Sequence, residues 1–411
     1  MKVAIFVGAL LASHASGEVT DAAANAINEF GLDLYGRLAK PGENLCVSPL
    51  SIQNALAMAY AGADGVTREE MARVLRYPIG DGIHDSFAAV NGALTEIQAR
   101  SAKWAAELKG RGVAFDPLSL NVVNRLYGQA GYDFSQPFLA RLDGTYHATM
   151  GILDFQKNPE DARTRINSWV EERTQRRMRN LLPKGAITKD TRLVLVNAVH
   201  LKARWFQEFR AEATKPEPFH VNGGRAKPVM TMIGLAGGSL ARRSGITAVR
   251  LPFADTELQF VVLIPDKMNG LAELEKNLTA ETLAGLSKEQ GPGTRLHLPK
   301  FRIEGKGIEL HELLGAMGMR SAFDQPKGSA DFGKIAPRKP DDYLFLSNVI
   351  HKAFISVEER GVEAAAAAVS PGVVGGDPLE MKVNRPFLFA IQHAPSGACL
   401  FLGRVTNPLS D

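Results

Sequence analysis

The sequence predicts an α+β protein whose helices and sheets fold as one unit. Helical periodicities and capping patterns concentrate before residue 190, and strand-like apolar runs concentrate after it. Beyond residue 20 there is no linker, repeat or composition break long enough to separate two domains. The chain has 411 residues, of which 45% are hydrophobic, enough for a large core. We therefore expect a single domain over residues 22–411.

Composition excludes several classes of partner. The formal net charge is only +4, too small to indicate a nucleic-acid partner, and no apolar run reaches the ~18 residues that span a bilayer. The nine histidines and two cysteines show no metal-ligand spacing, so we expect neither a metal nor a cofactor. We predict a monomer that binds neither nucleic acid nor membrane. Whether Cys46 and Cys399 pair is left open.

The first residues resemble a minimal export signal. Lys2 precedes an apolar run over residues 3–12, and Ser13-His14-Ala15 offers small residues at a cleavage site. We predict a signal peptide over residues 1–17 and a secreted or periplasmic protein. The alternative is a mildly apolar N-terminus that stays on a cytoplasmic protein.

Helix signals come first along the chain. An apolar stripe at spacings of three and four residues predicts a helix over residues 27–38. Ser48 before Pro49 predicts a capped helix start, and Thr67 with Glu70 predicts a capping box for a helix that ends near residue 75. A longer helix should open at Asn158-Pro159 and carry, near its end, Arg173, Arg176, Arg177 and Arg179.

Strand signals dominate the second half. These runs are rich in apolar and β-branched residues, and several are nearly continuous in apolar side chains, which is typical of strands buried within sheets. The expected strands cover residues 120–127, 193–201, 258–264, 296–303, 349–357, 383–391 and 399–405.

No motif of enzyme catalysis is present. The chain lacks a nucleophile elbow, a P-loop, a dinucleotide-binding glycine pattern and a zinc-protease motif, since His311-Glu312 is not followed by a second histidine. We predict no catalytic residue, and therefore a protein that is not an enzyme.

One long connection stands out between two buried strands. The strand that ends near Glu359 is followed by five consecutive alanines and a Gly/Pro-rich run, and the chain returns to strand near Met381. Loops of this length are uncommon unless they are functional or mobile. From composition alone, a flexible connector explains the segment equally well.

The residues around this loop resemble the serpins, the serine-protease-inhibitor superfamily. Glu-Glu-Arg-Gly at residues 358–361, followed by Val-Glu and five alanines, is similar to the serpin reactive-loop hinge. Seven further stretches match serpin patterns in the expected order, within a resemblance that spans residues 25–408. They are residues 44–52, 55–58, 197–205, 298–301, 351–353, 383–387 and 401–408.

The resemblance implies a serpin fold of about eight or nine helices around three β-sheets, with an exposed reactive-centre loop. It also implies suicide inhibition. A protease cleaves the loop, is held as an acyl-enzyme, and is distorted when the loop inserts into the central sheet. Insertion of roughly 14 residues at ~3.3 Å each would move the cut end by ~45 Å. The alternative is a non-inhibitory serpin, a carrier, chaperone or storage protein; the intact small-residue hinge favours inhibition.

The resemblance assigns roles to three groups of residues. The shutter beneath the central sheet comprises Ser48, Ser51, Asn197 and His351, and the breach at its opening comprises Trp205, Lys300 and Glu359, with Glu359 expected to pair with Lys300. The hinge comprises Glu359, Gly361, Val362, Glu363, Ala364, Ala365, Ala366, Ala367 and Ala368.

Family spacing also locates the bait. Counts from Gly361 and from Asn384 both reach Gly375, so the reactive bond is expected at Gly375-Gly376 or, one residue earlier, at Val374-Gly375. No Lys, Arg or aromatic residue lies between residues 361 and 381. Small and β-branched residues suit the shallow pocket of an elastase-like or subtilisin-like serine protease. A cysteine protease is a further candidate partner.

Overall fold

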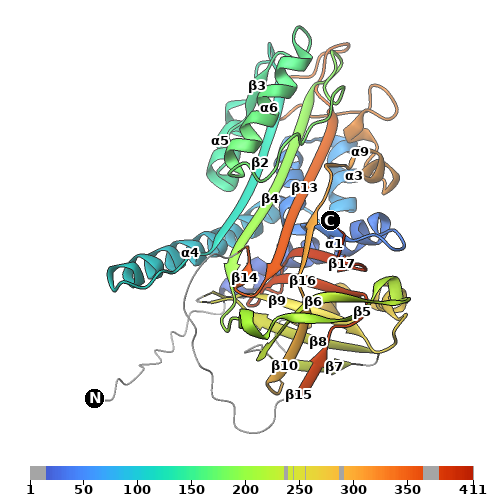
Figure 1. Ribbon diagram of the computed structural model, residues 1–411. Helices are drawn as coiled ribbons and strands as arrows, with labels where there is room; N and C mark the ends of the chain where they lie inside the picture. Colours follow the sequence, from blue (N-terminus) through green and yellow to red (C-terminus); the bar gives the residue numbers. More distant parts are fainter. Residues whose placement is uncertain are drawn as a thin grey trace.

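The computed structural model describes residues 15–235, 239–243, 245–254, 256–286, 291–363 and 379–410. Over these residues the chain forms nine α-helices and three β-sheets (Figure 1). The helices are α1 (Ala15–Leu38), α2 (Pro49–Tyr60), α3 (Gly65–Leu75), α4 (Gly82–Gly110), α5 (Gln136–Tyr146), α6 (Pro159–Arg173), α7 (Leu271–Asn277), α8 (Ala280–Gly285) and α9 (His311–Ala316).

The largest sheet has seven strands and is called here the central sheet. Its order is β11-β13-β14-β4-β2-β3, and β12 also pairs with β13. These strands are β2 (Ser119–Gln129), β3 (Gly151–Leu153), β4 (Leu193–Arg204), β11 (Phe301–Glu304), β12 (Ile308–Glu309), β13 (Leu346–Glu358) and β14 (Gly361–Val362).

Two smaller sheets pack below the central sheet in the view of Figure 1. The six-stranded sheet contains β1 (Leu45–Val47), β17 (Cys399–Val405), β16 (Phe387–His393), β9 (Leu258–Pro265), β8 (Ile246–Pro252) and β7 (Leu240–Arg243). The four-stranded sheet contains β15 (Leu379–Lys382), β10 (Thr294–Pro299), β6 (Ala226–Leu235) and β5 (Lys215–His220).

The middle of the central sheet is a parallel strand pair. β13 and β4 pair directly from Leu346 opposite Leu193 to Phe354 opposite His200. Beyond that point β14 lies between them and pairs antiparallel with both strands. The sheet is therefore parted at one end by two residues and closed along the rest of its length.

Alternation along β4 directs its side chains to two cores. Leu193, Leu195 and Val199 join the large cluster that includes α2, whereas Val194 and Val196 join a smaller cluster with residues of α6. Both faces of this strand are buried, which explains its nearly continuous apolar sequence. Anything inserted between β13 and β4 would have to fit both cores.

Several local expectations were wrong in detail. The capping box fails because α3 begins at Gly65, so Thr67 already lies inside the helix, while Glu70 accepts hydrogen bonds from Ser321 instead. The expected strand 296–303 is two strands in different sheets, β10 and β11. The expected strand 383–391 begins only at Phe387, and α6 ends at Arg173, ahead of the other three arginines.

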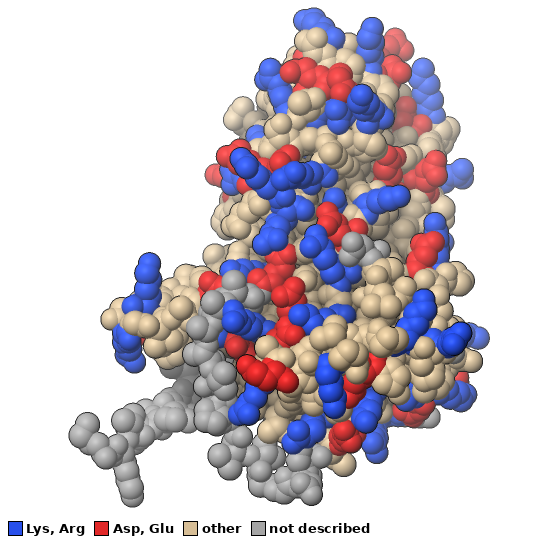
Figure 2. Space-filling model, in the orientation of Figure 1, with Lys and Arg blue, Asp and Glu red and all other residues tan. Residues whose placement is uncertain are grey.

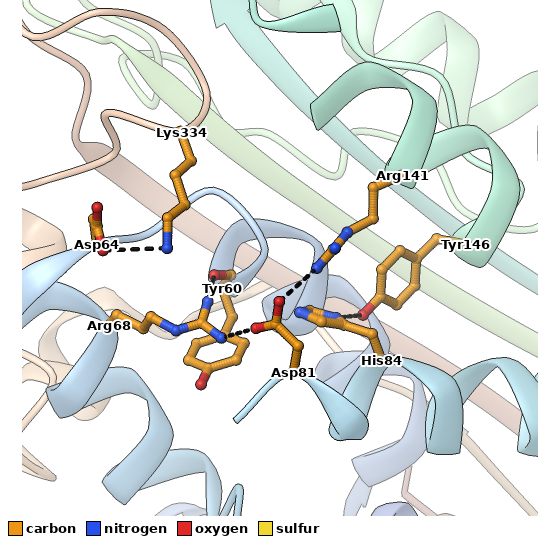
Figure 3. Close-up of polar contacts among 8 residues, drawn as sticks. All are labelled: Tyr60, Asp64, Arg68, Asp81, His84, Arg141, Tyr146 and Lys334. Carbon is orange, nitrogen blue, oxygen red and sulfur yellow. Dashed lines mark hydrogen bonds and ion pairs between the residues drawn. The ribbon is translucent and has the colours of Figure 1, made fainter. Parts of the chain in front are cut away.

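An ion-pair cluster connects three helices (Figure 3). The Asp81 carboxylate, just before α4, accepts hydrogen bonds from Arg68 of α3 and Arg141 of α5. Arg68 also lies over the Tyr60 ring, 4.0 Å from its centroid. Because these groups come from separate helices, the cluster fixes helix positions as well as neutralising charge.

The surface charges are mixed. Figure 2 shows Lys and Arg interspersed with Asp and Glu over the visible face. Within the described residues, no helix has both the length and the apolar character that a membrane crossing requires. The same residues contain no group of three or more His, Cys, Asp or Glu side chains arranged to hold a metal ion.

Candidate functional site

The four predicted shutter residues lie together beneath the β13–β4 pair. Ser48 caps α2 and donates from Oγ to the Leu400 carbonyl at 2.5 Å, while it accepts from the Ser51 N–H at 3.2 Å. Asn197 on β4 donates through Nδ2 to the Ser51 carbonyl at 2.9 Å. The cluster thus links α2 to the two strands that insertion would separate.

His351 on β13 connects to β4 through one ring nitrogen and to the start of α2 through the other. Its Nε2 accepts from the Ser48 N–H at 3.2 Å, and its Nδ1 contacts the Asn197 Oδ1, so the neutral ring carries its proton on Nδ1. The side chain is fully buried, and burial lowers its pKa to about 3. A proton added on Nε2 would face the Ser48 N–H. The ring is therefore neutral near pH 7 and part of a satisfied network.

Asn124 on β2 also belongs to the shutter, although the sequence did not single it out. Its Nδ2 donates to the Ser51 carbonyl at 3.2 Å, and its Oδ1 accepts from Asn197. β2 also carries Asn121 and Arg125, so the sequence of the strand held no signal that distinguished Asn124. The network therefore spans three strands of the central sheet and not only the two that part.

The breach residues lie where β14 enters the sheet. The Trp205 indole donates through Nε1 to the Glu358 carbonyl at 2.9 Å, and its backbone N–H donates to Arg360 at 2.9 Å. The ring stacks on Phe253, with centroids 5.0 Å apart and planes 7° apart. Trp205 therefore ties the end of β4 to the turn that leads into the hinge.

The predicted pair of Glu359 and Lys300 is present. Lys300 Nζ donates to the Glu359 carboxylate at 2.8 Å, and the two side chains are 34% and 16% exposed. Burial acts to raise the pKa of Glu359, but the hydrogen bonds from Lys300, a backbone N–H and Thr214, together with the Lys300 charge, outweigh burial and hold that pKa below the ordinary value. This pair fixes β10 and β11 to the start of the hinge.

The first hinge residues are already inside the central sheet. Gly361 has φ +150°, and a Cβ there would lie 2.0 Å from the Ala203 carbonyl oxygen, so only glycine fits. Val362 pairs with Val357 on one side and Ala203 on the other and is fully buried. Hinge residues 364–368 and the bait residues Val374, Gly375 and Gly376 lie outside the described residues.

The two cysteines are free, buried thiols. Cys46 lies opposite Gly403 on β17, four positions beyond Cys399, roughly 13 Å along a strand at ~3.3 Å per residue. A disulfide needs Cα atoms within about 7 Å, so these cysteines do not pair in this fold. Burial raises the pKa of both thiols, which makes them packing residues.

A protein-family comparison covers nearly the whole chain. The family model described as "Serpin (serine protease inhibitor)" matches residues 25–408. Leukocyte elastase inhibitor of Xenopus tropicalis is 34% identical over 394 residues, covering 93% of this chain and 99% of that protein. The Bos taurus protein of the same name is 34% identical over 396 residues, covering 93% and 98%. Serpin B10 of Papio anubis is 32% identical over 405 residues, covering 94% and 100%.

Solved structures give the same result for the architecture. Uncleaved ovalbumin aligns with a TM-score of 0.78 at 29% identity, covering 94% of this chain and all of that one (100%). Serpin48 of the insect Tenebrio molitor, titled a highly specific serpin, aligns with a TM-score of 0.73 at 28% identity, covering 96% and 100%. The likeness therefore extends over all three sheets.

Proposed function

The chain belongs to the serpin family, and we propose that it inhibits an elastase-like or subtilisin-like serine protease by suicide trapping. The protease cleaves the bait loop, and its catalytic serine becomes acylated by the cut end of the loop. The cut loop then enters the central sheet. A serpin of this type is an inhibitor and not an enzyme with turnover. The alternative of a carrier, chaperone or storage protein is not favoured, because the relatives at about 34% identity are named inhibitors.

One observation carries the mechanism. The hinge already lies between β13 and β4 at Gly361 and Val362, and below this point the two strands pair directly and in parallel. A strand continued from Val362 would run antiparallel to both neighbours and form two hydrogen-bond ladders in place of the one parallel ladder that now joins β13 and β4. Insertion therefore extends a pairing that the protein has begun, and the shutter and breach contacts oppose the parting of the strands.

Two observations support the target class. The relatives include proteins named leukocyte elastase inhibitor, and the segment from residue 361 to 381 has no Lys, Arg or aromatic residue for a deep specificity pocket. Val373, Val374 and Gly375 offer small side chains to a shallow pocket. A cysteine protease with a similar preference is the second candidate target.

The decisive test is formation of a covalent complex. Mixing the protein with pancreatic elastase should give an SDS-resistant adduct weighing about as much as both chains minus a small C-terminal peptide. The released peptide should begin at Gly375 or Gly376 by mass spectrometry. Competitive inhibition without adduct or cleavage would contradict trapping. Rapid trapping of trypsin, or a peptide that begins at Lys382 or later, would show the bait to be misplaced.

We propose export as the second part of the assignment. The basic, apolar and small-residue pattern of residues 1–17 supports it, and residues 1–14 lie outside the described residues. N-terminal sequencing of protein from the native source tests this. A mature N-terminus between Ser16 and Glu18 is expected; retention of Lys2 would contradict cleavage of a signal peptide.

A further inference from the structure

The point where the hinge leaves the central sheet is a fork between two strands. Direct pairing of β13 with β4 ends at Phe354 and His200, and β14 fills the gap beyond it. Glu363 is the first residue after β14. Its N–H still donates to the Ser356 carbonyl on β13 at 3.1 Å. The chain therefore turns out of the sheet at this one residue.

The backbone of Glu363 cannot stay as it is during insertion. It has φ +51°, in the left-handed region that non-glycine residues seldom adopt. An inserted strand needs φ near −140° at the same residue. Loop entry must therefore begin with a conformational change at Glu363, before any alanine behind it can enter the sheet.

The side chain of Glu363 is held in place as well. It is only 6% exposed, and its Oε2 contacts Nε2 of the buried His200 on β4. Its Oε1 lies 3.6 Å from the guanidinium of Arg177, in the segment that follows α6. The His200 ring in turn packs beside Phe354, with centroids 6.1 Å apart. Three groups from separate parts of the chain thus meet at the fork.

The register shows that insertion would shift Glu363 along β4 and give its carboxylate a new direct neighbour. Since Val362 lies opposite Ala203, an extended Glu363 would come opposite Lys202, two pairs away from His200. The carboxylate would exchange His200 and Arg177 for Lys202, which now pairs with Asp116 at 3.1 Å. A buried carboxylate gives up such partners only at a free-energy cost.

We propose that Glu363, His200 and Arg177 form a latch that sets the rate at which the reactive loop enters the central sheet. The contacts hold the docked hinge in its turned-out conformation and must open before insertion proceeds. The inference rests on the insertion mechanism proposed above and adds its rate-controlling contact.

The test follows the intact protein and needs no protease target. On mild heating, conversion to the loop-inserted form is measured as acquired thermal stability and as resistance of the loop to a nicking protease. Glu363→Gln should speed conversion about tenfold and Arg177→Gln about threefold. The double variant should be no faster than Glu363→Gln alone, because both changes open one latch.

Matched controls separate the latch from general destabilisation. Glu358→Gln makes the same chemical change on the neighbouring strand β13, and Arg176→Gln makes it on the same segment as Arg177. Both should convert at the wild-type rate. Unchanged or slower conversion in Glu363→Gln would overturn the latch, as would acceleration of the controls to the same extent.

The latch and the proposed function can fail separately. If no protease forms an adduct but Glu363→Gln still converts faster, the latch stands and trapping fails. If adducts form while heating converts neither wild type nor Glu363→Gln, the latch is overturned and trapping stands.

Discussion

At the scale of single residues, polar groups in the core decide how the central sheet stays closed. His351 is neutral and donates to Asn197 while accepting from Ser48, and this arrangement has no room for a second ring proton. Such a network stabilises only while every member is satisfied. Its residues therefore make the closed sheet sensitive to protonation, although they bind no substrate.

Acid should weaken the closed sheet through His351. The folded pKa is about 3, below the value of ~6.5 expected in the unfolded chain, so protons bind the unfolded state more readily. The stability from this group is complete above pH ~6.5 and declines as pH falls toward 3, on the order of 1 kcal/mol per pH unit. Urea unfolding at several pH values measures the slope.

A pair of variants isolates this histidine. His351→Asn should flatten the pH slope between pH 6.5 and 4.5, whereas the more exposed His220→Gln should leave it unchanged. His84, whose pKa burial lowers to about 4, adds to the slope in every variant. A wild-type slope in His351→Asn would contradict the assignment.

At the scale of elements, ion pairs hold helices in position, and strand periodicity determines which hinge residues face the core. The Asp81 cluster joins α3, α4 and α5, which lie beside the central sheet (Figure 3). Along the hinge, alternation places Ala364, Ala366 and Ala368 on the same face as the buried Val362 once the strand is extended. The core that already buries Val362 has room only for small side chains on that face of the inserted strand.

Asp81→Asn should loosen the helix cluster by a modest amount. Burial acts to raise the pKa of Asp81, but Arg68 and Arg141 outweigh it and hold the pKa below its ordinary value. The carboxylate is 62% exposed, so solvent screening limits the loss of stability to less than about 1 kcal/mol. This contribution is present above the unfolded pKa and disappears as pH falls below it.

Thermal unfolding at pH 7 measures the effect. Asp33→Asn serves as the control, because among the described residues Asp33 forms an ion pair with one arginine, Arg76. A larger loss of stability in Asp33→Asn than in Asp81→Asn would show that pairing one carboxylate with two arginines adds no extra stability.

Ala366→Arg should convert the inhibitor into a substrate. A long charged side chain on the face shared with Val362 would enter an apolar core at a cost of several kcal/mol. Cleavage should continue while trapping fails, so that the stoichiometry of inhibition rises severalfold. Ala366→Val, apolar and β-branched, is the matched control and should keep trapping. An unchanged stoichiometry in the arginine variant would show that this position is never buried.

At the scale of the whole molecule, the proposed mechanism requires the intact fold to be a kinetically trapped state. β14 pairs with both β13 and β4 over two residues, and below it an inserted strand would replace the one parallel ladder between β13 and β4 with two antiparallel ladders. Insertion there gains hydrogen bonds and buried apolar area. The barrier to separating β13 from β4 would then hold the protein in its intact form. The lifetime of that form is set by the rate of strand separation and not by an equilibrium.

Cleavage in the bait should therefore raise thermal stability. A gain of several kcal/mol from the added strand should increase Tm by about 5 °C or more, since each kcal/mol shifts Tm by roughly 1–2 °C in a chain of this length. Nicking between Val373 and Asp377, followed by calorimetry beside the intact protein, measures the difference. Equal Tm values before and after nicking would indicate a relative that does not insert its loop.

The sequence by itself determined the features carried by local patterns and ordered motifs. The α+β class, the start of α2 at Ser48-Pro49 and the strands β2, β4, β9, β13 and β17 all followed from periodicity and capping residues. The motifs also named the shutter residues and the pair of Glu359 with Lys300, because those residues lie within the matched stretches.

Only the tertiary structure decided which distant segments meet. It divided the apolar run at 296–303 between two sheets, added Asn124 to the shutter, separated Cys46 from Cys399, and brought Glu363 against His200 and Arg177. These results depend on strand register and on packing between residues far apart in the chain. Local propensity carries no information about either, since one residue of register reverses which face a side chain occupies.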